Sequence, residues 1–405
     1  MLNLALALVV SLTASACVID RVGGAFSKPP EELAQGAGST ARNLIEQALK
    51  GIDPARRVDY HTHMIATGTS VEGAFINPRM LKGANLQRLK FQIFASASGV
   101  KDIGNIDREY VARLVRLVRT TKGHGKYHIL AFDKYYNADG SVSRQKTNIY
   151  VPNHYVFELA RTHPDIFVPV VSVHPYRPDA LQELEKWARQ GVKYVKWLPN
   201  AMGMDPADPA VEPFYLKMKE HNMILLSHAG KEQAVHVADD QWLGNPLRLR
   251  KPLDLGLRVI VAHAASLGSC EDLDRREAKP TECFDLFMRL MDEPKYRGLL
   301  FGEISAMPQI NRMPAPLATL LKRQDLHPRL VNGSDYPLPA INSLIWTRAL
   351  ARGGFITAEE REALNEIYDY NPLLFDFVLK RTLRHPETRQ KLSPAIFMAN
   401  PGLEN

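Results

Sequence analysis

Five residues of types that commonly bind metal ions stand at the ends of predicted strands: His61, His63, His228, His263 and Asp335. Residues two apart in a strand lie on the same face, so His61 and His63 can bind one cation together. Imidazole nitrogens and carboxylate oxygens suit Zn²⁺ or a similar divalent cation, and a catalytic site keeps one position open for water. The sequence therefore predicts a half-open metal site formed by His61, His63, His228 and Asp335.

The prediction depends on the whole set of residues. A single His-x-His pair, or a single histidine at a strand end, is more often structural than metal-binding. Here histidines end the first, fifth and sixth predicted strands, and an aspartate ends the eighth. In a barrel of parallel strands these ends meet at the face where barrel enzymes react.

Eight predicted strands alternate with amphipathic helical patterns along the chain. Apolar strands that alternate with helices indicate parallel pairing, and eight repeats are the number that closes a barrel. We therefore predict an α/β fold, the (β/α)8 TIM barrel. An open doubly wound sheet is the alternative, but no glycine-rich phosphate loop follows the first strand. The predicted strands cover residues 58–63, 127–134, 167–174, 192–198, 223–229, 257–263, 299–305 and 329–335.

Two connections, after strands one and two, are too long for simple turns. They cover residues 65–105 and 135–152, and at the carboxyl ends of barrel strands such segments usually cover the active site. We predict that both are lid loops over a substrate pocket. Basic residues in them would face that pocket or the solvent: Arg79, Lys82, Arg88, Lys90 and Arg144.

The composition is that of one soluble folded unit of 405 residues with 45% hydrophobic residues. The excess of 51 Lys and Arg over 44 Asp and Glu is spread thinly, so it predicts solvated surface and no nucleic-acid partner. A small-molecule substrate is expected, and oligomerisation stays open. We divide the chain into a signal peptide (1–16), a linker and helix (17–55), the barrel (56–380) and a tail (381–405).

The first residues resemble an export signal. The uncharged apolar run from Leu2 to Leu12 is too short to span a bilayer, and small residues precede Cys17. Cys17 stands where bacterial lipoproteins carry a lipidated cysteine, so we expect an exported protein, either periplasmic or anchored to a membrane through Cys17. The remaining cysteines, Cys270 and Cys283, would then form a disulfide, and two separate buried thiols are the alternative.

With these strand ends the sequence resembles the amidohydrolase superfamily, and more closely its amidohydrolase-related branch of metal-dependent hydrolases and decarboxylases. The resemblance runs from about Val58 to Phe375 and implies one metal ion per chain, with His263 beside it as an acid/base or electrophilic group. The motifs that carry the resemblance are Asp59-Tyr60-His61-Thr62-His63, Val195-Lys196, Ser227-His228-Ala229-Gly230, Ala262-His263 and Gly333-Ser334-Asp335-Tyr336-Pro337.

The expected chemistry uses the cation to activate water and to polarise a substrate carbonyl. Asp335 would bind the ion through one oxygen and accept a proton with the other, and His263 would assist the transfer. Lys196, His174 and Glu303 would contact the substrate or the ligands. The alternatives are a carbamylated Lys196 that bridges two ions and a structural His174 before Pro175.

These expectations favour a metal-dependent hydrolase that cleaves a C–N or C–O bond of an amide, lactone or ester. A metal-dependent decarboxylase or other lyase that acts on a small carboxylic acid is the first alternative. A lipoprotein that keeps the barrel only as a binding module is the second alternative.

Overall fold

The computed structural model describes residues 19, 22–24, 28–237, 239–277 and 279–404. Eight parallel strands form one sheet in the order β1-β3-β5-β6-β7-β8-β11-β12. The strands are β1 (Val58–His63), β3 (Lys126–Leu130), β5 (Phe167–Val171), β6 (Tyr194–Trp197), β7 (Ile224–His228), β8 (Val259–Ala262), β11 (Leu300–Glu303) and β12 (Leu330–Val331).

The sheet closes where its last strand returns to its first. Three backbone hydrogen bonds join the two edges: Tyr60 N to Asn332 O at 2.9 Å, Asp335 N to His61 O at 2.7 Å and His63 N to Tyr336 O at 3.0 Å. Because each strand is followed by at least one helix outside the sheet, the predicted (β/α)8 barrel is confirmed.

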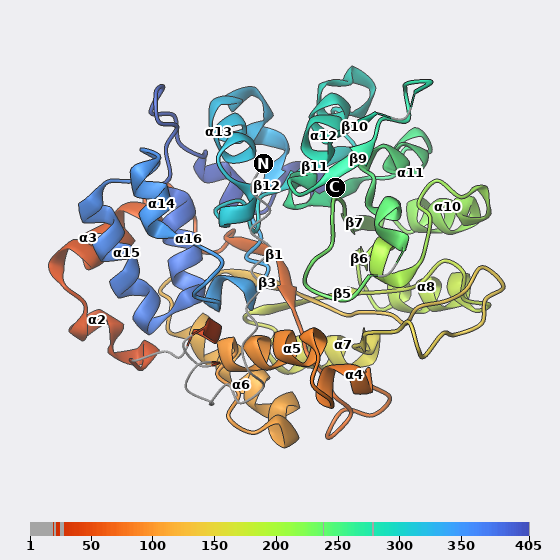
Figure 1. The fold of residues 1–405 in the computed structure, drawn as a ribbon, viewed down its shortest axis with the longest axis horizontal. Coiled ribbons are helices and arrows are strands. Elements are labelled where there is room, and N and C mark those ends of the chain that lie inside the picture. The colour runs from red at the N-terminus through yellow and green to blue at the C-terminus, as the bar shows by residue number, and fades with distance from the viewer. Residues whose placement is uncertain (1–18, 20–21, 25–27, 238, 278, 405) are drawn as a thin grey trace.

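Helices surround the strands (Figure 1). In α8 (Ala180–Arg189), for example, Ala180, Leu184 and Trp187 are buried at helical spacing, so this face packs on the sheet. The other helices are α2 (Leu33–Gly36), α3 (Ser39–Leu49), α4 (Pro78–Leu81), α5 (Leu86–Ala97), α6 (Ile106–Arg119), α7 (Asn153–Thr162), α9 (Pro199–Met202), α10 (Glu212–Glu220), α11 (Arg250–Asp254), α12 (Cys283–Asp292), α13 (Ala315–Lys322), α14 (Thr347–Arg352), α15 (Ala358–Tyr370), α16 (Pro372–Thr382) and α17 (Pro401–Glu404).

The barrel has a small inner core and a larger core between the sheet and the helices. In β7, Ile224 and Leu226 belong to the inner core, whereas Leu225 belongs to the outer one. This alternation follows from the two-residue period of a strand. The residues that we assigned to a tail reach the inner core, because Leu403 packs there and Asn400 N donates to the Tyr60 hydroxyl at 3.1 Å.

The segments predicted as lids contain short elements that pair with each other. β2 (Phe75–Ile76) lies antiparallel to β4 (Ile149–Tyr150), and α4 and α5 follow β2. Both segments also contact the loop of residues 231–237. Lys90 Nζ of α5 donates to Gln233 O at 2.6 Å, and Asn148 Nδ2 donates to His236 O at 2.8 Å.

The hairpin after β8 carries the predicted disulfide. Cys270 and Cys283 are bonded, with their α-carbons 5.0 Å apart, so this prediction is confirmed. The hairpin strands are β9 (Ser269–Glu271) and β10 (Pro280–Glu282). Ion pairs from Asp272 to Arg289 at 2.8 Å and from Arg289 to Asp274 at 2.7 Å hold the polar turn, which has few apolar residues of its own.

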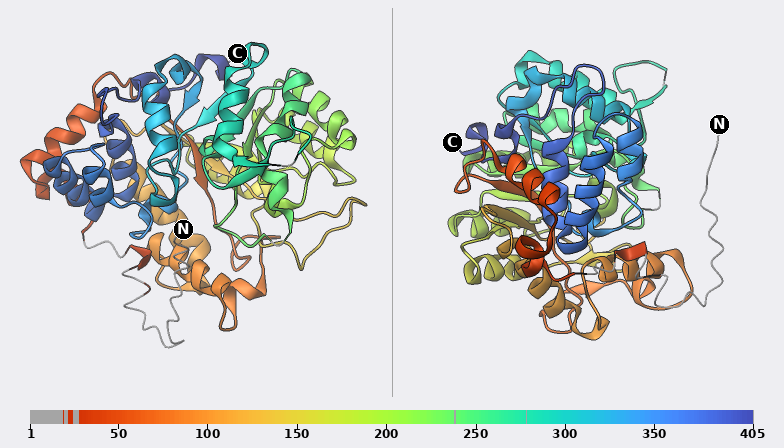
Figure 2. Two further views of the ribbon diagram at one scale, coloured as in Figure 1. Left: turned by 45° about the horizontal axis from the view of Figure 1, so that its top comes forward. Right: turned by 90° about the vertical axis from the view of Figure 1, so that its left-hand side faces the viewer.

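At the amino-terminal side, α3 packs against α15 and α16, as both views in Figure 2 show. The predicted signal peptide and Cys17 lie outside the described residues. Among the helices that the structure describes, none has the length and apolar character needed to cross a membrane.

Candidate metal centre

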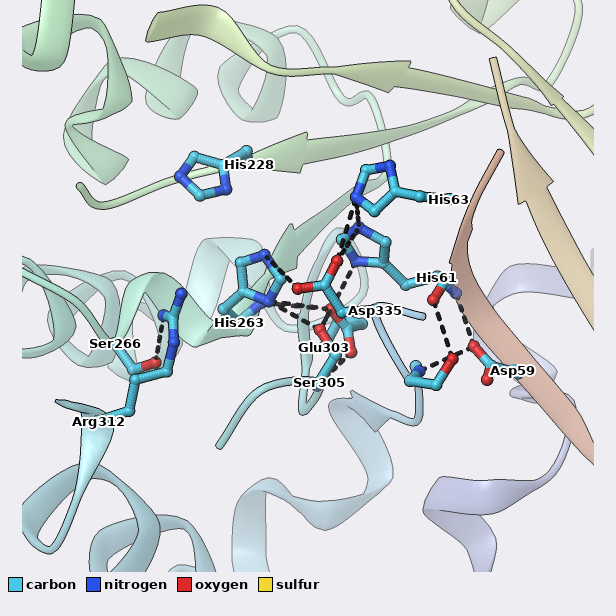
Figure 3. Close-up of polar contacts among 12 residues, drawn as sticks. Asp59, His61, His63, His228, His263, Ser266, Glu303, Ser305, Arg312 and Asp335 are labelled. Atoms are coloured by element: carbon cyan, nitrogen blue, oxygen red, sulfur yellow. Dashed lines mark hydrogen bonds and ion pairs between the residues drawn. The ribbon is translucent and has the colours of Figure 1, made fainter. Parts of the chain in front are cut away.

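His61, His63 and Asp335 meet at the carboxyl ends of β1 and β12 (Figure 3). His61 Nε2 lies 3.2 Å from His63 Nε2 and 3.4 Å from Asp335 Oδ1, and His63 Nε2 lies 3.1 Å from the same oxygen. Both histidines come from one strand two residues apart, as their spacing predicted.

The orientation of His61 follows from a carboxylate behind it. Glu303 Oε2 accepts a hydrogen bond from His61 Nδ1 at 3.0 Å. Burial, together with the nearby Lys196, lowers the pKa of His61 well below its ordinary value, so the ring is neutral. With the proton on Nδ1, His61 Nε2 presents a lone pair to His63 and Asp335.

This arrangement fits a divalent cation. Two ligands that each lie about 2.1 Å from one ion are about 3.0 to 3.4 Å apart at octahedral or tetrahedral angles. The three separations, 3.1, 3.2 and 3.4 Å, fall in that range. A nitrogen lone pair and a carboxylate oxygen repel each other at such distances, and a cation bound between them removes this repulsion. The three residues therefore have both the spacing and the chemistry of a metal site.

His228, the fourth predicted ligand, lies farther off. It does not belong to either close ligand group, and in Figure 3 it stands apart from the network of dashed contacts. Its ring centre is 5.3 Å from that of His263, and its Nε2 is buried without a hydrogen-bond partner among the described residues. Glu232 Oε2 lies 3.7 Å from this nitrogen. A buried nitrogen without a partner at the edge of this group has the property expected of a ligand.

His263 is joined to Glu303 through Ser305. Its Nδ1 lies 2.7 Å from Ser305 Oγ, and that hydroxyl donates to Glu303 Oε2 at 2.7 Å. Because the Ser305 hydroxyl donates its proton to Glu303, it can only accept a hydrogen bond from His263. His263 therefore carries its proton on Nδ1 and has a free lone pair on Nε2. That nitrogen lies 3.8 Å from Asp335 Oδ2. Burial lowers the pKa of His263 well below its ordinary value.

Two of these residues have left-handed backbone conformations. The φ angle is 56° at His263 and 58° at Asp335. This region is unfavourable for residues with a β-carbon and is commoner at functional sites, where the surrounding structure stabilises it. At Asp335 the conformation ends the extended strand and turns the side chain toward His61 and His63.

Buried polar contacts hold the loop that carries Asp335. Asp59 Oδ1 accepts from His61 N at 3.0 Å and from Ser334 N at 2.9 Å, which joins β1 to this loop. Lys380 Nζ of α16 donates to Gly333 O at 2.7 Å. A β-carbon at Gly333 would lie 2.6 Å from both Glu303 Oε1 and His61 Cβ, so only glycine fits between these residues.

The three predicted substrate contacts lie in different places. Lys196 lines the cavity, and its Nζ is 3.2 Å from His61 Nε2. Burial lowers the pKa of Lys196 to about 8, although Asp335 and Glu303 favour its charged form. Glu303 is buried behind His61. His174 is outside the cavity wall, where its Nε2 donates to Met202 O at 2.9 Å and its Nδ1 accepts from Tyr176 N at 3.1 Å.

A cavity of about 1030 Å³ opens over the metal centre. Arg79 and Lys90 from the segment after β1 line it, whereas Lys82, Arg88 and Arg144 are not among its lining residues. Its other charged lining residues are Lys196, Lys231, Glu232, Arg312 and Asp335, so cations outnumber carboxylates in the wall. Ser305 and Arg312 were not singled out from the sequence, because both are in irregular segments after β11 where no spacing marks them.

Several solved structures resemble this chain at low sequence identity. No curated protein matches the chain. An uncharacterized TIM-barrel protein from Bordetella bronchiseptica is 15% identical with a TM-score of 0.49, over 77% of this chain and 99% of the other. A 5-carboxyvanillate decarboxylase from Novosphingobium aromaticivorans, with bound manganese, is 12% identical with a TM-score of 0.46, over 80% and 95%.

A probable 2-pyrone-4,6-dicarboxylic acid hydrolase from Acinetobacter baumannii is 15% identical with a TM-score of 0.43, over 78% of this chain and 100% of the other. Among family models, that of the amidohydrolases matches residues 58–362, which covers β1 to β12 and each residue of the metal centre. This chain belongs to the amidohydrolase family.

Proposed function

We propose that this protein is a metal-dependent hydrolase that cleaves a C–N or C–O bond in an amide, lactone or ester. The observation that carries the proposal is the placement of the two carboxylate oxygens of Asp335. Oδ1 lies with His61 Nε2 and His63 Nε2, whereas Oδ2 faces His263 Nε2 at 3.8 Å. One oxygen of Asp335 can thus bind the metal ion while the other exchanges a proton with His263.

Zn²⁺, one per chain, is the cation that we propose, with His61, His63, His228 and Asp335 as ligands. When bound, a divalent cation polarises a carbonyl group and lowers the pKa of water. The chain's own residues must hold the substrate and move the protons.

Proton transfer is assigned to Asp335 and His263. As the water oxygen bonds to the carbonyl carbon, Asp335 Oδ2 accepts one water proton. That proton passes to the leaving nitrogen or oxygen as the C–N or C–O bond breaks, which yields an acid and an amine or alcohol. His263 Nε2 has an available lone pair, so it can hold this proton between the two steps. Ser305 and Glu303 keep His263 in the required tautomer.

A metal-dependent decarboxylase is the second candidate. The observation that favours it is the basic wall of the cavity. Among the described residues that line it, the cations Arg79, Lys90, Lys196, Lys231 and Arg312 outnumber the carboxylates Glu232 and Asp335. Such a wall suits a carboxylic acid, and a carboxylate is the group that a decarboxylase removes.

The product distinguishes the two reactions. Zinc-reconstituted protein should be incubated with a panel of lactones, amides and aromatic carboxylates, and the products analysed by mass spectrometry and carbon dioxide release. Hydrolytic fragments without carbon dioxide are expected. Carbon dioxide release would favour the decarboxylase, and no turnover of any compound would favour a binding module.

We also propose that the protein is exported and anchored through lipidated Cys17. The disulfide between Cys270 and Cys283 supports an oxidising compartment. Expression of the full chain and of Cys17→Ala in a bacterium, followed by fractionation, tests the anchor. The full chain should be found in the membrane fraction and the variant in the soluble exported fraction. Retention of the full chain in the cytoplasm would contradict export.

A further inference from the structure

Arg312 has a buried guanidinium group with one side-chain hydrogen bond and no ion pair among the described residues. Only 6% of the residue is exposed, and it lines the cavity over the metal centre. Among the described residues, its side chain donates one hydrogen bond, from Nη1 to Ser266 Oγ at 3.0 Å (Figure 3). Its Nε is buried without a partner in that part of the chain. No carboxylate of the described residues lies within 4.0 Å of it.

Arg177, a partly buried arginine, contacts Asp133 at 3.2 Å and Asp179 at 2.8 Å. Arg57 is also buried without a carboxylate partner among the described residues, but it lies away from the cavity, stacks on the Phe377 ring and donates to Gly123 O at 3.1 Å. Burial of a guanidinium without an anion is costly, since the charge loses its hydration and gains no counter-charge.

The nearby Asp335 and Glu232 favour the charged form of Arg312 but do not contact it. Glu232 is bonded elsewhere. Its Oε1 accepts from the backbone amides of Ala234 and Val235, and it forms no ion pair with Arg312.

We propose that Arg312 and Ser266 form a subsite for a carboxylate group of the substrate. The planar guanidinium presents its donors in a fork that matches the two oxygens of a carboxylate. Ser266 Oγ accepts from Nη1, which fixes the plane of the fork and leaves the hydroxyl proton available to the ligand.

The subsite lies beside the metal centre. Ser266 stands three residues after His263 in the segment that follows β8, and Arg312 stands seven residues after Ser305 in the segment that follows β11. Figure 3 shows both residues on the side of His263 and His228 that faces away from His61 and His63. A substrate carboxylate held here would be displaced from the metal group and would not compete for its ligands.

Much of the apolar lining of the cavity comes from the segments after β1 and β3, strands that lie three and four places from β8 around the barrel. The apolar lining residues from these segments are Met64, Ile65, Met80, Leu86, Ile93, Phe94, Phe132 and Ile149. A substrate that reaches from Arg312 to these residues therefore has a carboxylate at one end and an apolar body at the other, with its reacting group between them.

This substrate class rests on the proposed function for its reacting bond. In the hydrolase reading, the substrate is an N-acyl amino acid or a similar carboxylate-bearing amide or ester, and the carboxylate on Arg312 is not the group that reacts.

Binding of two matched probes tests the subsite without turnover. 4-Phenylbutyrate and its neutral counterpart 4-phenylbutyramide should be titrated by calorimetry into the zinc-loaded full chain, and again after zinc removal. We expect the acid to bind at least about tenfold more tightly than the amide in both forms. Arg312→Gln should weaken acid binding by about 10- to 100-fold and leave amide binding unchanged. Arg312→Lys, which keeps the charge without the fork, should lie between them.

Arg79→Gln is the matched control, because Arg79 is an exposed cation at the edge of the same cavity. It should change acid binding by less than about threefold. Three results would overturn the subsite: equal binding of acid and amide, unchanged acid binding in Arg312→Gln, or an equal loss in Arg79→Gln. Unchanged amide binding by the Arg312 variants shows that they fold. Since these measurements need no reaction, failure of the hydrolase proposal would leave them unaffected.

Discussion

Glu303 Oε2 accepts the Nδ1 proton of His61 at 3.0 Å, so a carboxylate outside the cavity determines which nitrogen of His61 faces the metal group. The same oxygen accepts from Ser305 Oγ at 2.7 Å, and the chain of contacts continues to His263. One buried side chain therefore orients both a predicted ligand and the predicted proton-transfer residue.

Loss of this carboxylate should weaken metal binding. Glu303→Ala should lower the zinc affinity by about 10- to 100-fold, because the outer partner fixes the tautomer of His61. Competition with a chromophoric chelator measures the affinity. Glu183→Gln, which changes a carboxylate on the outer helix α8, is the control and should leave it unchanged. A normal zinc affinity in Glu303→Ala would refute this role.

Removal of a ligand should remove the metal. His61→Ala and Asp335→Asn each delete a group that meets the other ligands within 3.4 Å, so both should lose most of the bound ion together with activity. Elemental analysis after dialysis gives the occupancy. His228→Ala tests the fourth ligand in the same way, and His174→Asn should retain full occupancy because His174 lies outside the cavity wall. Full occupancy in the first two variants would disprove the assignment.

His263 should affect turnover more than metal content. His263→Asn should keep about one ion per chain and lose activity by roughly 100- to 10,000-fold, the range for a positioned proton-transfer group. Parallel measurements of kcat and zinc content separate these two effects. Loss of the ion would instead make His263 a ligand.

The fold could be predicted from the sequence because apolar strands and amphipathic helices repeat eight times, a pattern set by local residue types. The ends of the strands were less predictable. The last strand was expected over 329–335, but its ladder covers only Leu330–Val331, and beyond it Asn332 N donates to Ile396 O.

The sequence could not predict which neighbouring residues the side chains of the site contact. Glu303 was expected to contact the substrate or the ligands, since its place at a strand end is visible in the sequence. That it contacts His61, two strands away around the barrel, depends on the tertiary fold. Arg312 ends a single 3-10 turn, Ile310–Arg312, which is too short to show a periodicity in the sequence, so only the tertiary fold brings it to the cavity. The disulfide was predictable because few cysteines leave few pairings.

The free energy of unfolding should decrease as the pH is lowered, because His128 is buried in its neutral form. It lies between Tyr60 and Tyr194, with ring centres 4.7 and 4.5 Å away, and burial lowers its pKa from 6.5 to about 3. The unfolded chain therefore takes up a proton below pH 6.5 that the folded protein does not bind until about pH 3. In this window the free energy of unfolding should decrease by about 1.4 kcal/mol per pH unit from this residue.

Urea unfolding of wild type and His128→Phe between pH 4.5 and 6.5 measures this contribution. A packing change in the variant alters the free energy of unfolding by the same amount at every pH. The slope against pH therefore reports only the protonation of His128. The slope should be shallower in His128→Phe by about 1.4 kcal/mol per pH unit at the acid end. Parallel slopes would show that His128 is not responsible.

The disulfide should stabilise the hairpin of β9 and β10. Replacement of both Cys270 and Cys283 by serine should lower the free energy of unfolding by about 2 to 3 kcal/mol, as expected for a short closed loop. Denaturant unfolding of the oxidised wild type and the double variant measures the difference, and peptide mass spectrometry should find the two cysteines linked. Two free thiols in exported protein would contradict the pairing.

The close packing around Gly333 restricts substitutions at the residues that contact it, whereas other residues of the cavity are free of this restriction. A methyl group there would meet His61 and Glu303 at 2.6 Å, so the ends of β1, β11 and β12 can be altered only together. Arg312 and α5, in contrast, belong to segments that do not pass through this contact. During divergence within the family, selection for a new substrate therefore has freedom in the walls of the cavity, while the residues packed around Gly333 remain under joint constraint.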